Sequence, residues 1–94
     1  MDMLTYLEAL ITDRKNNPQP GSYTNSLFDE GLSRMAQKVG EEATEVVVAV
    51  LSQSKTTQIN EISDLFYHTL VLMVDRGIAL DDISAELERR HRKS

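Results

Sequence analysis

Cysteine and tryptophan are absent from this 94-residue sequence, which also contains only two prolines and four glycines. Without cysteine the chain has neither disulfides nor thiolate metal ligands, as is common in cytosolic proteins. There is no run of about 18 apolar residues to span a membrane, and the first residues are acidic rather than basic, unlike a signal peptide. We therefore expect a cytoplasmic protein that has no membrane partner.

An excess of positive charge is also missing. The chain has 10 lysines and arginines against 15 aspartates and glutamates, a net charge of −5. This balance argues against nucleic acid as a partner, because phosphate contacts need cations. The same acidity would repel a nucleotide unless the carboxylates hold a divalent cation. With 40% hydrophobic residues, the chain is expected to fold as a single domain over residues 1–94.

Strand signals are missing as well, and the helical spacing of apolar residues dominates the chain. The pattern predicts an all-α fold, an antiparallel bundle of four main helices completed by homodimerisation. Ser33 is expected to cap the second main helix, and Gly77 to follow the end of the third. The predicted main helices cover residues 2–15, 32–52, 58–75 and about 80–90, and a short helical piece lies between Ser22 or Thr24 and Gly31.

The expected dimer follows from the third main helix, which is apolar on nearly all sides between Ile59 and Val74. Such a helix is buried, yet the first and last helices offer only narrow apolar stripes to cover it. Leu70 and Val74 are expected to stay exposed in a monomer, and an exposed apolar patch marks an interface. A homodimer with twofold symmetry is the commonest way to close such a patch.

Two pairs of acidic residues lie among apolar neighbours on the two central helices. On the first helix, Glu42 is expected at the edge of the apolar face and Glu45 about 60° further round. On the second, Glu61 and Asp64 have the i, i+3 spacing that places both on one side. The apolar face of the first helix is expected to consist of Met35, Val39, Ala43, Val46, Val47 and Val50.

Buried carboxylates need a partner, a proton or a metal ion, and few basic residues surround these acids. Four carboxylates on antiparallel helices can surround a hard cation, so the pattern favours Mg²⁺ or Mn²⁺. A di-iron bundle would instead carry Glu-x-x-His on two helices, and here an acid occupies the corresponding position. The alternative, that the acids are simply solvated, stays open above all for Glu41.

The roles of several other residues are left open by the pattern. His68 lies one helical turn beyond the second acidic pair. It can hydrogen-bond a carboxylate, bind metal or pack against the core. We favour either a contact with the metal ligands or a role in core packing. Lys38 is either a salt-bridge partner of the acids or a phosphate contact. Arg89 and Arg90 form either a phosphate clamp or a solvated helix end. Composition alone favours a helix cap over a phosphate contact for the hydroxyls at residues 22–24.

Four segments of the chain resemble the phosphoribosyl-ATP pyrophosphohydrolases, the second enzymes of histidine biosynthesis, within the all-α MazG-like nucleoside-triphosphate pyrophosphohydrolases. The resemblance covers essentially the whole chain. Its acidic pattern is typical of the superfamily, and its Ser-Tyr-Thr, Lys-Val-Gly and Tyr-His segments indicate this branch. The segments are Ser22-Tyr23-Thr24, Lys38-Val39-Gly40-Glu41-Glu42-Ala43-x-Glu45-Val46, Glu61-x-x-Asp64-Leu65-x-Tyr67-His68 and Leu87-x-x-Arg90-His91.

The resemblance implies a Mg²⁺-dependent homodimer that hydrolyses the α–β phosphoanhydride of 1-(5-phosphoribosyl)-ATP. Glu41 or Glu42 would activate the water. Metal ligands would be Glu42, Glu45, Glu61 and Asp64, and substrate contacts would come from Ser22, Tyr23, Thr24, Lys38, His68, Arg89 and Arg90. Two alternatives remain. A house-cleaning pyrophosphohydrolase of nonstandard nucleoside triphosphates would share the acids, and a non-catalytic helical interaction protein would need none.

Overall fold

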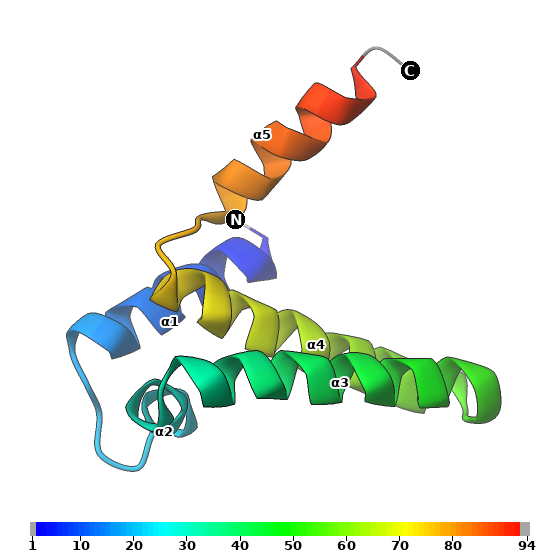
Figure 1. Ribbon diagram of the computed structural model, residues 1–94, viewed down its shortest axis with the longest axis horizontal. Helices are drawn as coiled ribbons and strands as arrows, with labels where there is room; N and C mark the ends of the chain where they lie inside the picture. Colours follow the sequence, from blue (N-terminus) through cyan, green and yellow to red (C-terminus); the bar gives the residue numbers. More distant parts are fainter. Residues whose placement is uncertain (1, 93–94) are drawn as a thin grey trace.

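The structure, a computed structural model, describes residues 2–92, and every regular element in that range is an α-helix. This confirms the all-α prediction, and the short helical piece is a helix of its own, which makes five in the described range (Figure 1). The helices are α1 (Met3–Asn16), α2 (Tyr23–Glu30), α3 (Leu32–Ser52), α4 (Lys55–Asp75) and α5 (Leu80–His91). Within residues 2–92, no helix has the length and apolar character needed to cross a membrane.

Side-chain caps explain where three of the helices begin. Asp2, Ser22 and Ser54 each accept a hydrogen bond from a backbone N–H in the first turn of α1, α2 and α4, respectively, which satisfies a donor that the helix itself leaves free. Because of this cap, α4 begins before the predicted residue 58. The prediction that Ser33 caps α3 is wrong, because the helix follows Gly31 and Ser33 lies inside its first turn.

The end of α4 follows the prediction made from Gly77. The φ angle of this residue is 70°, a left-handed conformation that glycine adopts without steric cost. The backbone N–H of Gly77 donates to the carbonyl of Val74 at 3.2 Å, and that of Ile78 donates to Met73 at 2.9 Å. These are the paired bonds of a Schellman motif, which ends α4 and turns the chain toward α5.

α3 and α4 form the long antiparallel pair at the centre of the fold, and only Gln53 and Ser54 connect them (Figure 1). On each helix, buried or half-buried residues recur at alternating spacings of four and three, the spacing of a helix–helix seam. The stripe on α3 comprises Met35, Val39, Glu42, Val46 and Ala49, and the stripe on α4 comprises Thr57, Glu61, Asp64, His68 and Val71.

These stripes correct the predicted face of α3. Glu42 lies in the middle of the buried stripe rather than at the edge of an apolar face, and Ala49 is fully buried. Val47 and Val50, which were predicted to be buried, are exposed. The prediction was wrong because it followed apolar residues alone, whereas the facing stripe of α4 is itself largely polar.

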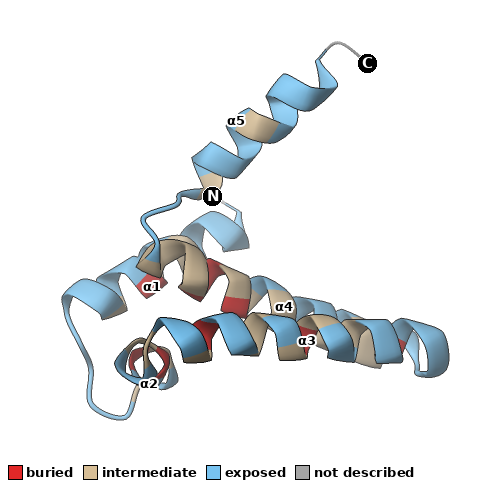
Figure 2. Ribbon diagram, viewed as in Figure 1, coloured by how far each residue is buried: buried red, intermediate tan, exposed pale blue. Residues whose placement is uncertain are grey.

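The hydrophobic core lies at one end of the α3–α4 pair, where α1 and α2 pack against it (Figure 2). The expectation that Leu70 and Val74 stay exposed in a single chain is wrong. Leu70 is buried in this core, and Val74 packs against it. The first two helices therefore cover more of α4 than their narrow apolar stripes suggest. The buried core side chains are Ile11, Leu27, Met35, Leu70 and Val71.

The opposite end of the α3–α4 pair has little cover, as the pale-blue ribbon near the α3–α4 connection shows in Figure 2. Apolar side chains are exposed on both helices there and further along α4. They are Val47, Val48, Val50, Leu51, Ile59, Ile62 and Phe66. We call this set the apolar surface of the helix pair. Large apolar side chains gathered on one part of a protein surface are typical of an interface.

α5 projects away from the rest of the molecule (Figure 1). Its start is held by Glu8 of α1, whose carboxylate accepts a hydrogen bond from the backbone N–H of Leu80 at 2.7 Å. Between residues 80 and 91, no side chain is buried, and the apolar residues Ile83 and Leu87 are exposed. The last helix is thus anchored at its first turn and otherwise lacks packing within the described chain.

Candidate active site

Three acidic side chains meet between α3 and α4, in the middle of the two buried stripes. One carboxylate oxygen from each of Glu42, Glu45 and Glu61 lies within 4.8 Å of the other two. Glu42 is only 6% exposed, Glu61 is half-buried and Glu45 is exposed. We call these residues the acid cluster. Like charges at this separation repel each other strongly, so the cluster requires protons or a cation to balance it.

Two oxygens of the acid cluster are buried without a hydrogen-bond partner. They are the Oε2 atoms of Glu42 and Glu61, for which no donor is found among residues 2–92. The other oxygen of Glu42 lies 3.3 Å from Nζ of Lys38. Burying a carboxylate oxygen without a partner is costly, and hard divalent cations bind oxygen ligands of this kind. The arrangement therefore fits the predicted Mg²⁺ or Mn²⁺.

The charge on the cluster is reflected in the acidity of Glu45. A proton on Glu45 would be shared first with Glu61 and then with Glu42, and this sharing, together with the negative charge of Glu42, raises the pKa of Glu45 from 4.5 to about 7. Both effects favour the protonated form, as expected where carboxylates share a site. A cation bound between these groups would remove the cause, because it stabilises each carboxylate in its charged form.

Asp64, the fourth predicted ligand, does not belong to the acid cluster. It is half-buried on the same stripe of α4, one turn beyond Glu61, but its carboxylate is not among the three that approach within 4.8 Å. Its backbone carbonyl accepts a hydrogen bond from Nδ1 of His68 at 2.8 Å. The role of Asp64 as a metal ligand stays a prediction.

Glu41, the predicted activator of water, is half-buried and lies beside an arginine that the sequence reasoning missed. Nη1 of Arg34 donates to its carboxylate at 3.2 Å, and Nε of the same arginine lies 3.4 Å from Glu30. Part of the signal was available in the sequence, because Arg34 and Glu41 lie two turns apart on the same predicted helix. Arg34 therefore links the end of α2 to the helix that carries the acids.

Lys38, which the sequence singled out, is a cation beside the acid cluster. It lies one turn before Glu42. Burial tends to lower the pKa of Lys38, but the hydrogen bond to Glu42 and nearby negative charges outweigh it, so the pKa is raised overall. Lys38 is thus a charged ammonium against the buried carboxylate, which supports the predicted salt bridge. A contact with phosphate stays a prediction.

The start of α2 is fastened to α4 by aromatic and hydroxyl side chains. Oη of Tyr23 lies 3.0 Å from Nε2 of His68, and the hydroxyls of Thr24 and Tyr67 are hydrogen-bonded to each other. The rings of Tyr23 and Tyr67 are stacked with centroids 6.2 Å apart. Ser22 is occupied as the cap of α2. Of the three predicted substrate contacts in this segment, two hydroxyls therefore serve the fold, and Tyr23 remains more than half exposed.

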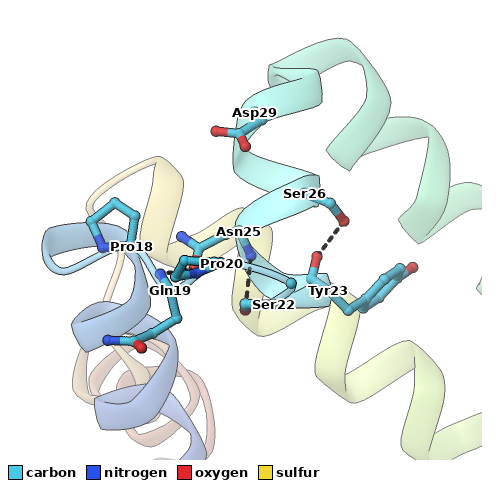
Figure 3. A pocket seen from close by; sticks show the side chains of 9 residues that line it. Pro18, Gln19, Pro20, Ser22, Tyr23, Asn25, Ser26 and Asp29 are labelled. Atoms are coloured by element: carbon cyan, nitrogen blue, oxygen red, sulfur yellow. Dashed lines mark hydrogen bonds between the residues drawn. The ribbon is translucent and has the colours of Figure 1, made fainter.

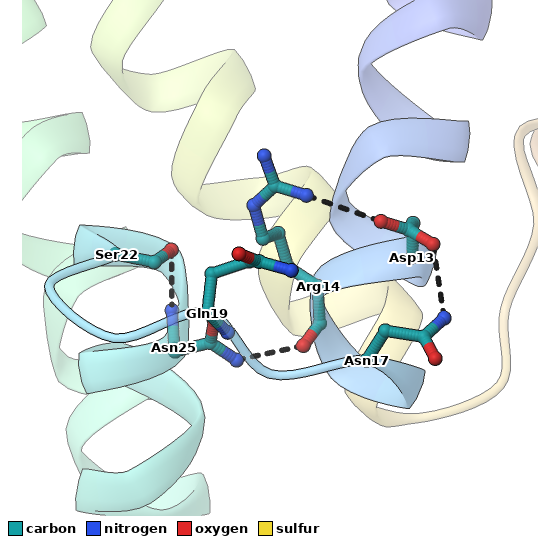
Figure 4. A network of polar contacts seen from close by, with 6 residues as sticks. All are labelled: Asp13, Arg14, Asn17, Gln19, Ser22 and Asn25. Carbon is teal, nitrogen blue, oxygen red and sulfur yellow. Dashed lines mark hydrogen bonds and ion pairs between the residues drawn. The ribbon is translucent and has the colours of Figure 1, made fainter.

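An open pocket of about 640 Å³ lies beside the start of α2. Figure 3 shows Pro18 and Gln19 on one side of it, and the Tyr23 ring points away from them. Asn25, which sequence reasoning missed, is the buried polar residue that holds this wall in place. It accepts from the N–H of Gln19 at 2.9 Å and donates to the carbonyl of Arg14 at 2.7 Å (Figure 4).

The predicted phosphate clamp of Arg89 and Arg90 lies outside this site within the single chain. Both side chains are exposed on α5 and both bind Glu86, one turn earlier on the same helix. α5 points away from the α3–α4 pair (Figure 1), so these arginines do not meet the acid cluster of their own chain. Their contact with substrate stays a prediction.

Comparison with known proteins gives matches over nearly the whole chain. Residues 4–91 match the family described as phosphoribosyl-ATP pyrophosphohydrolase. The phosphoribosyl-ATP pyrophosphatase of Clostridium acetobutylicum is 50% identical over 92 residues, covering 98% of this chain and 84% of that protein. Its counterpart in Streptococcus thermophilus is 51% identical, covering 94% and 83%. The histidine biosynthesis bifunctional protein HisIE of Caldanaerobacter subterraneus is 50% identical, covering 99% of this chain and 45% of that protein.

Proposed function

Because this chain belongs to the phosphoribosyl-ATP pyrophosphohydrolase family, we propose that it hydrolyses 1-(5-phosphoribosyl)-ATP to 1-(5-phosphoribosyl)-AMP and pyrophosphate. The reaction breaks the α–β phosphoanhydride and is the second step of histidine biosynthesis. The observation that carries the proposal is the acid cluster, since its unpartnered oxygens fit a cation that a polyphosphate substrate also binds. The absence of cysteine supports a place in the reducing cytoplasm.

Glu42, Glu45 and Glu61 would hold Mg²⁺ or Mn²⁺, with Asp64 as a further ligand one turn away. When bound, such a cation neutralises charge on the phosphates during hydrolysis. The residues of the chain bind and orient the other components. Lys38 adds a positive charge beside the cluster.

Glu41 orients and deprotonates the attacking water, once its carboxylate exchanges Arg34 for that water. Substituting Glu41 and Glu42 one at a time separates activation of the water from metal binding. Glu41→Gln is expected to lower kcat while leaving the rise in melting temperature with Mg²⁺ unchanged. Glu42→Gln is expected to abolish both. If Glu41→Gln removes the Mg²⁺ effect and Glu42→Gln does not, the two residues exchange roles.

The activity is tested by measuring pyrophosphate release from 1-(5-phosphoribosyl)-ATP in parallel with ATP and a panel of nonstandard nucleoside triphosphates. We expect kcat/KM to be highest for 1-(5-phosphoribosyl)-ATP. A preference for a nonstandard triphosphate would replace the proposal with a house-cleaning pyrophosphohydrolase, and no hydrolysis of any substrate would leave a helical interaction protein. Glu42→Gln serves as the inactive control, because it removes the most buried member of the cluster.

The chain acts as a homodimer that closes the apolar surface of the helix pair. The apolar surface presents seven large exposed side chains of α3 and α4, and a twofold symmetric contact buries such a surface on both copies at once. This surface replaces Leu70 and Val74 as the physical reason for the dimer. Ile59, Ile62 and Phe66 recur at spacings of three and four along α4, which presents them on one side of the helix.

The dimer is tested by sedimentation at micromolar protein and by melting at increasing protein concentration. We expect a mass of two chains and a melting temperature that rises with concentration. Phe66→Glu places a charge in the apolar surface and is expected to yield a monomer. Tyr6→Glu, at an exposed side chain of α1 outside that surface, is the matched control. A folded and active monomer of the wild-type chain at nanomolar concentration would contradict the dimer.

A further inference from the structure

The direction of the hydrogen bond between Tyr23 and His68 follows from the other partner of the imidazole ring. His68 is 7% exposed, and its Nδ1 lies 2.8 Å from the backbone carbonyl of Asp64. A carbonyl oxygen only accepts, so Nδ1 carries the hydrogen and donates it. In the neutral ring Nε2 is then an acceptor. With the ring neutral, the hydroxyl of Tyr23, 3.0 Å away, donates to His68.

This direction determines what Tyr23 offers to a ligand. The phenol has a single hydrogen, which the bond to His68 uses. The oxygen keeps lone pairs, and the side chain is 54% exposed, so toward solvent Tyr23 presents an acceptor. A phosphate oxygen at neutral pH is an acceptor too and gains nothing from such a contact. The complementary ligand group is an O–H or N–H donor.

Lys38 has the opposite character to Tyr23. Its ammonium, which only donates, binds Glu42 of the acid cluster, whereas Tyr23 contacts His68 on the stripe of α4 that also carries Glu61. A donor and an acceptor thus lie along the two stripes that carry the acids. A nucleotide offers the complementary pair of groups, because its phosphates accept hydrogen bonds and its ribose hydroxyls donate them. The ribose nearest to the acid cluster is the one that carries the α-phosphate.

We propose that Tyr23 determines specificity by accepting a hydrogen bond from a hydroxyl of the ATP-derived ribose, with His68 as the positioning residue that orients the Tyr23 proton. This inference rests on the proposed function, because it takes the substrate from there. It differs from a phosphate contact in one respect that can be measured: removing the tyrosine oxygen matters only when the substrate still has the matching hydroxyl.

The experiment is a double-mutant cycle between enzyme and substrate. Wild type and Tyr23→Phe are assayed with the 1-(5-phosphoribosyl) derivatives of ATP, 2′-deoxy-ATP and 3′-deoxy-ATP. Tyr23→Phe is expected to lower kcat/KM for the ribose substrate about five- to tenfold, mainly through KM, as for one neutral hydrogen bond. With the deoxy substrate that lacks the contacted hydroxyl, Tyr23→Phe is expected to leave kcat/KM unchanged. Equal losses on all three substrates would overturn the proposal.

His68 is tested by two substitutions that separate its packing from its acceptor. His68→Phe keeps an aromatic ring against Tyr23 and Tyr67, whose centroids lie 5.9 and 5.1 Å from the imidazole, but removes the acceptor. It is expected to weaken the preference for the ribose substrate, because the Tyr23 hydroxyl is then free to rotate and to donate its hydrogen elsewhere. His68→Gln restores an acceptor oxygen and is expected to recover the preference. A preference unchanged in His68→Phe would show that His68 does not orient the Tyr23 proton.

Tyr6→Phe provides the matched control, because Tyr6 is an exposed tyrosine on α1 and is expected to behave as wild type on all three substrates. Binding of the product 1-(5-phosphoribosyl)-AMP, measured by calorimetry, should weaken in Tyr23→Phe by the same factor as KM rises. The two proposals fail in different ways. A wild-type chain that does not hydrolyse 1-(5-phosphoribosyl)-ATP overturns the proposed function, whereas an active wild type with uniform Tyr23→Phe losses overturns this inference alone.

Discussion

The acid cluster and the arginines of α5 each gather charge in one place, and they are arranged in opposite ways. In the cluster, Glu42, Glu45 and Glu61 carry charge of one sign, and two of their oxygens are buried without a partner. On α5, Arg89 and Arg90 are exposed, and both bind Glu86 on their own helix. One arrangement leaves buried oxygens without a partner, and the other is balanced by ion pairs within the isolated chain.

This difference makes the acid cluster a stronger indication of function than the arginines of α5. An uncompensated group inside a protein costs free energy, so its presence indicates a ligand or a chemical role. An exposed ion pair within one helix contributes little to stability and needs no further partner. The acids of α3 and α4 are therefore the basis of the proposed activity, and the arginines need a second copy of the chain to take part in it.

The largest effect is expected from removing single charges of the acid cluster. Glu42→Gln, Glu45→Gln and Glu61→Gln should each lower kcat about 100-fold or more while the helical circular dichroism stays unchanged, by analogy with other preorganised charge stabilisers. Glu86→Gln on α5 is the matched control, with activity within about twofold. Near wild-type turnover at saturating Mg²⁺ in any two of the cluster variants would contradict the role of the acid cluster in catalysis.

Asp64→Asn sharpens the same experiment, because Asp64 lies outside the acid cluster yet was predicted as a ligand. A loss of about 100-fold, equal to that of the glutamates, is expected if its carboxylate joins them when the cation is bound. Turnover within about threefold of wild type would restrict the metal site to the three glutamates.

The next largest effect is expected from Mg²⁺ on stability. A cation that binds only the folded state stabilises it by about 2.7 kcal/mol at 100 times its Kd, which corresponds to more than about 10 °C in melting temperature for a domain of this size. Differential scanning calorimetry should show this rise in the wild-type chain and not in Glu42→Gln. An equal rise in both proteins would place the cation elsewhere.

A smaller effect is expected from pH in the metal-free protein. The pKa of Glu45 is raised in the folded state to about 7, above its ordinary 4.5. The folded chain therefore binds this proton more tightly than the unfolded chain, and the stabilisation present below pH 4.5 is lost as the pH rises through 7. The melting temperature should fall by a few degrees more in wild type than in Glu45→Gln between pH 5 and 8. If the melting temperatures of the two proteins fall in parallel with pH, Glu45 is not the source of the pH dependence.

The smallest effect on stability is expected from α5. Arg90→Ala removes an exposed ion pair with Glu86 and should change the free energy of unfolding by less than about 1 kcal/mol. Its activity tests the predicted phosphate clamp. If mixing Arg90→Ala chains with Glu42→Gln chains restores turnover, each site draws on both copies of the dimer. If Arg90→Ala alone is fully active, the arginine has no part in catalysis.

Helix positions were predictable to within a few residues, because local chemistry governs them. Gly77 adopts the left-handed conformation that ends a helix, and Ser22 caps α2 as its side chain allows. Two errors remain, the Ser33 cap predicted for α3 and the start predicted for α4 at residue 58. Ser33 lies near the start of α3, and Ser52 and Ser54 lie near the start of α4, but only the folded backbone determines which serine, if any, has an N–H within reach.

The acidic pairs and their i, i+3 spacing were evident before any folding, and so was the family resemblance, because both depend on residue identity along single helices. The partners of those residues were not. Glu42 proved to lie in the middle of the seam, Glu41 beside Arg34, and Tyr23 against His68 across 45 positions of the chain. Which helix faces meet depends on how polar and apolar stripes fit together in three dimensions, and a periodic pattern on one helix carries no information about the stripe opposite.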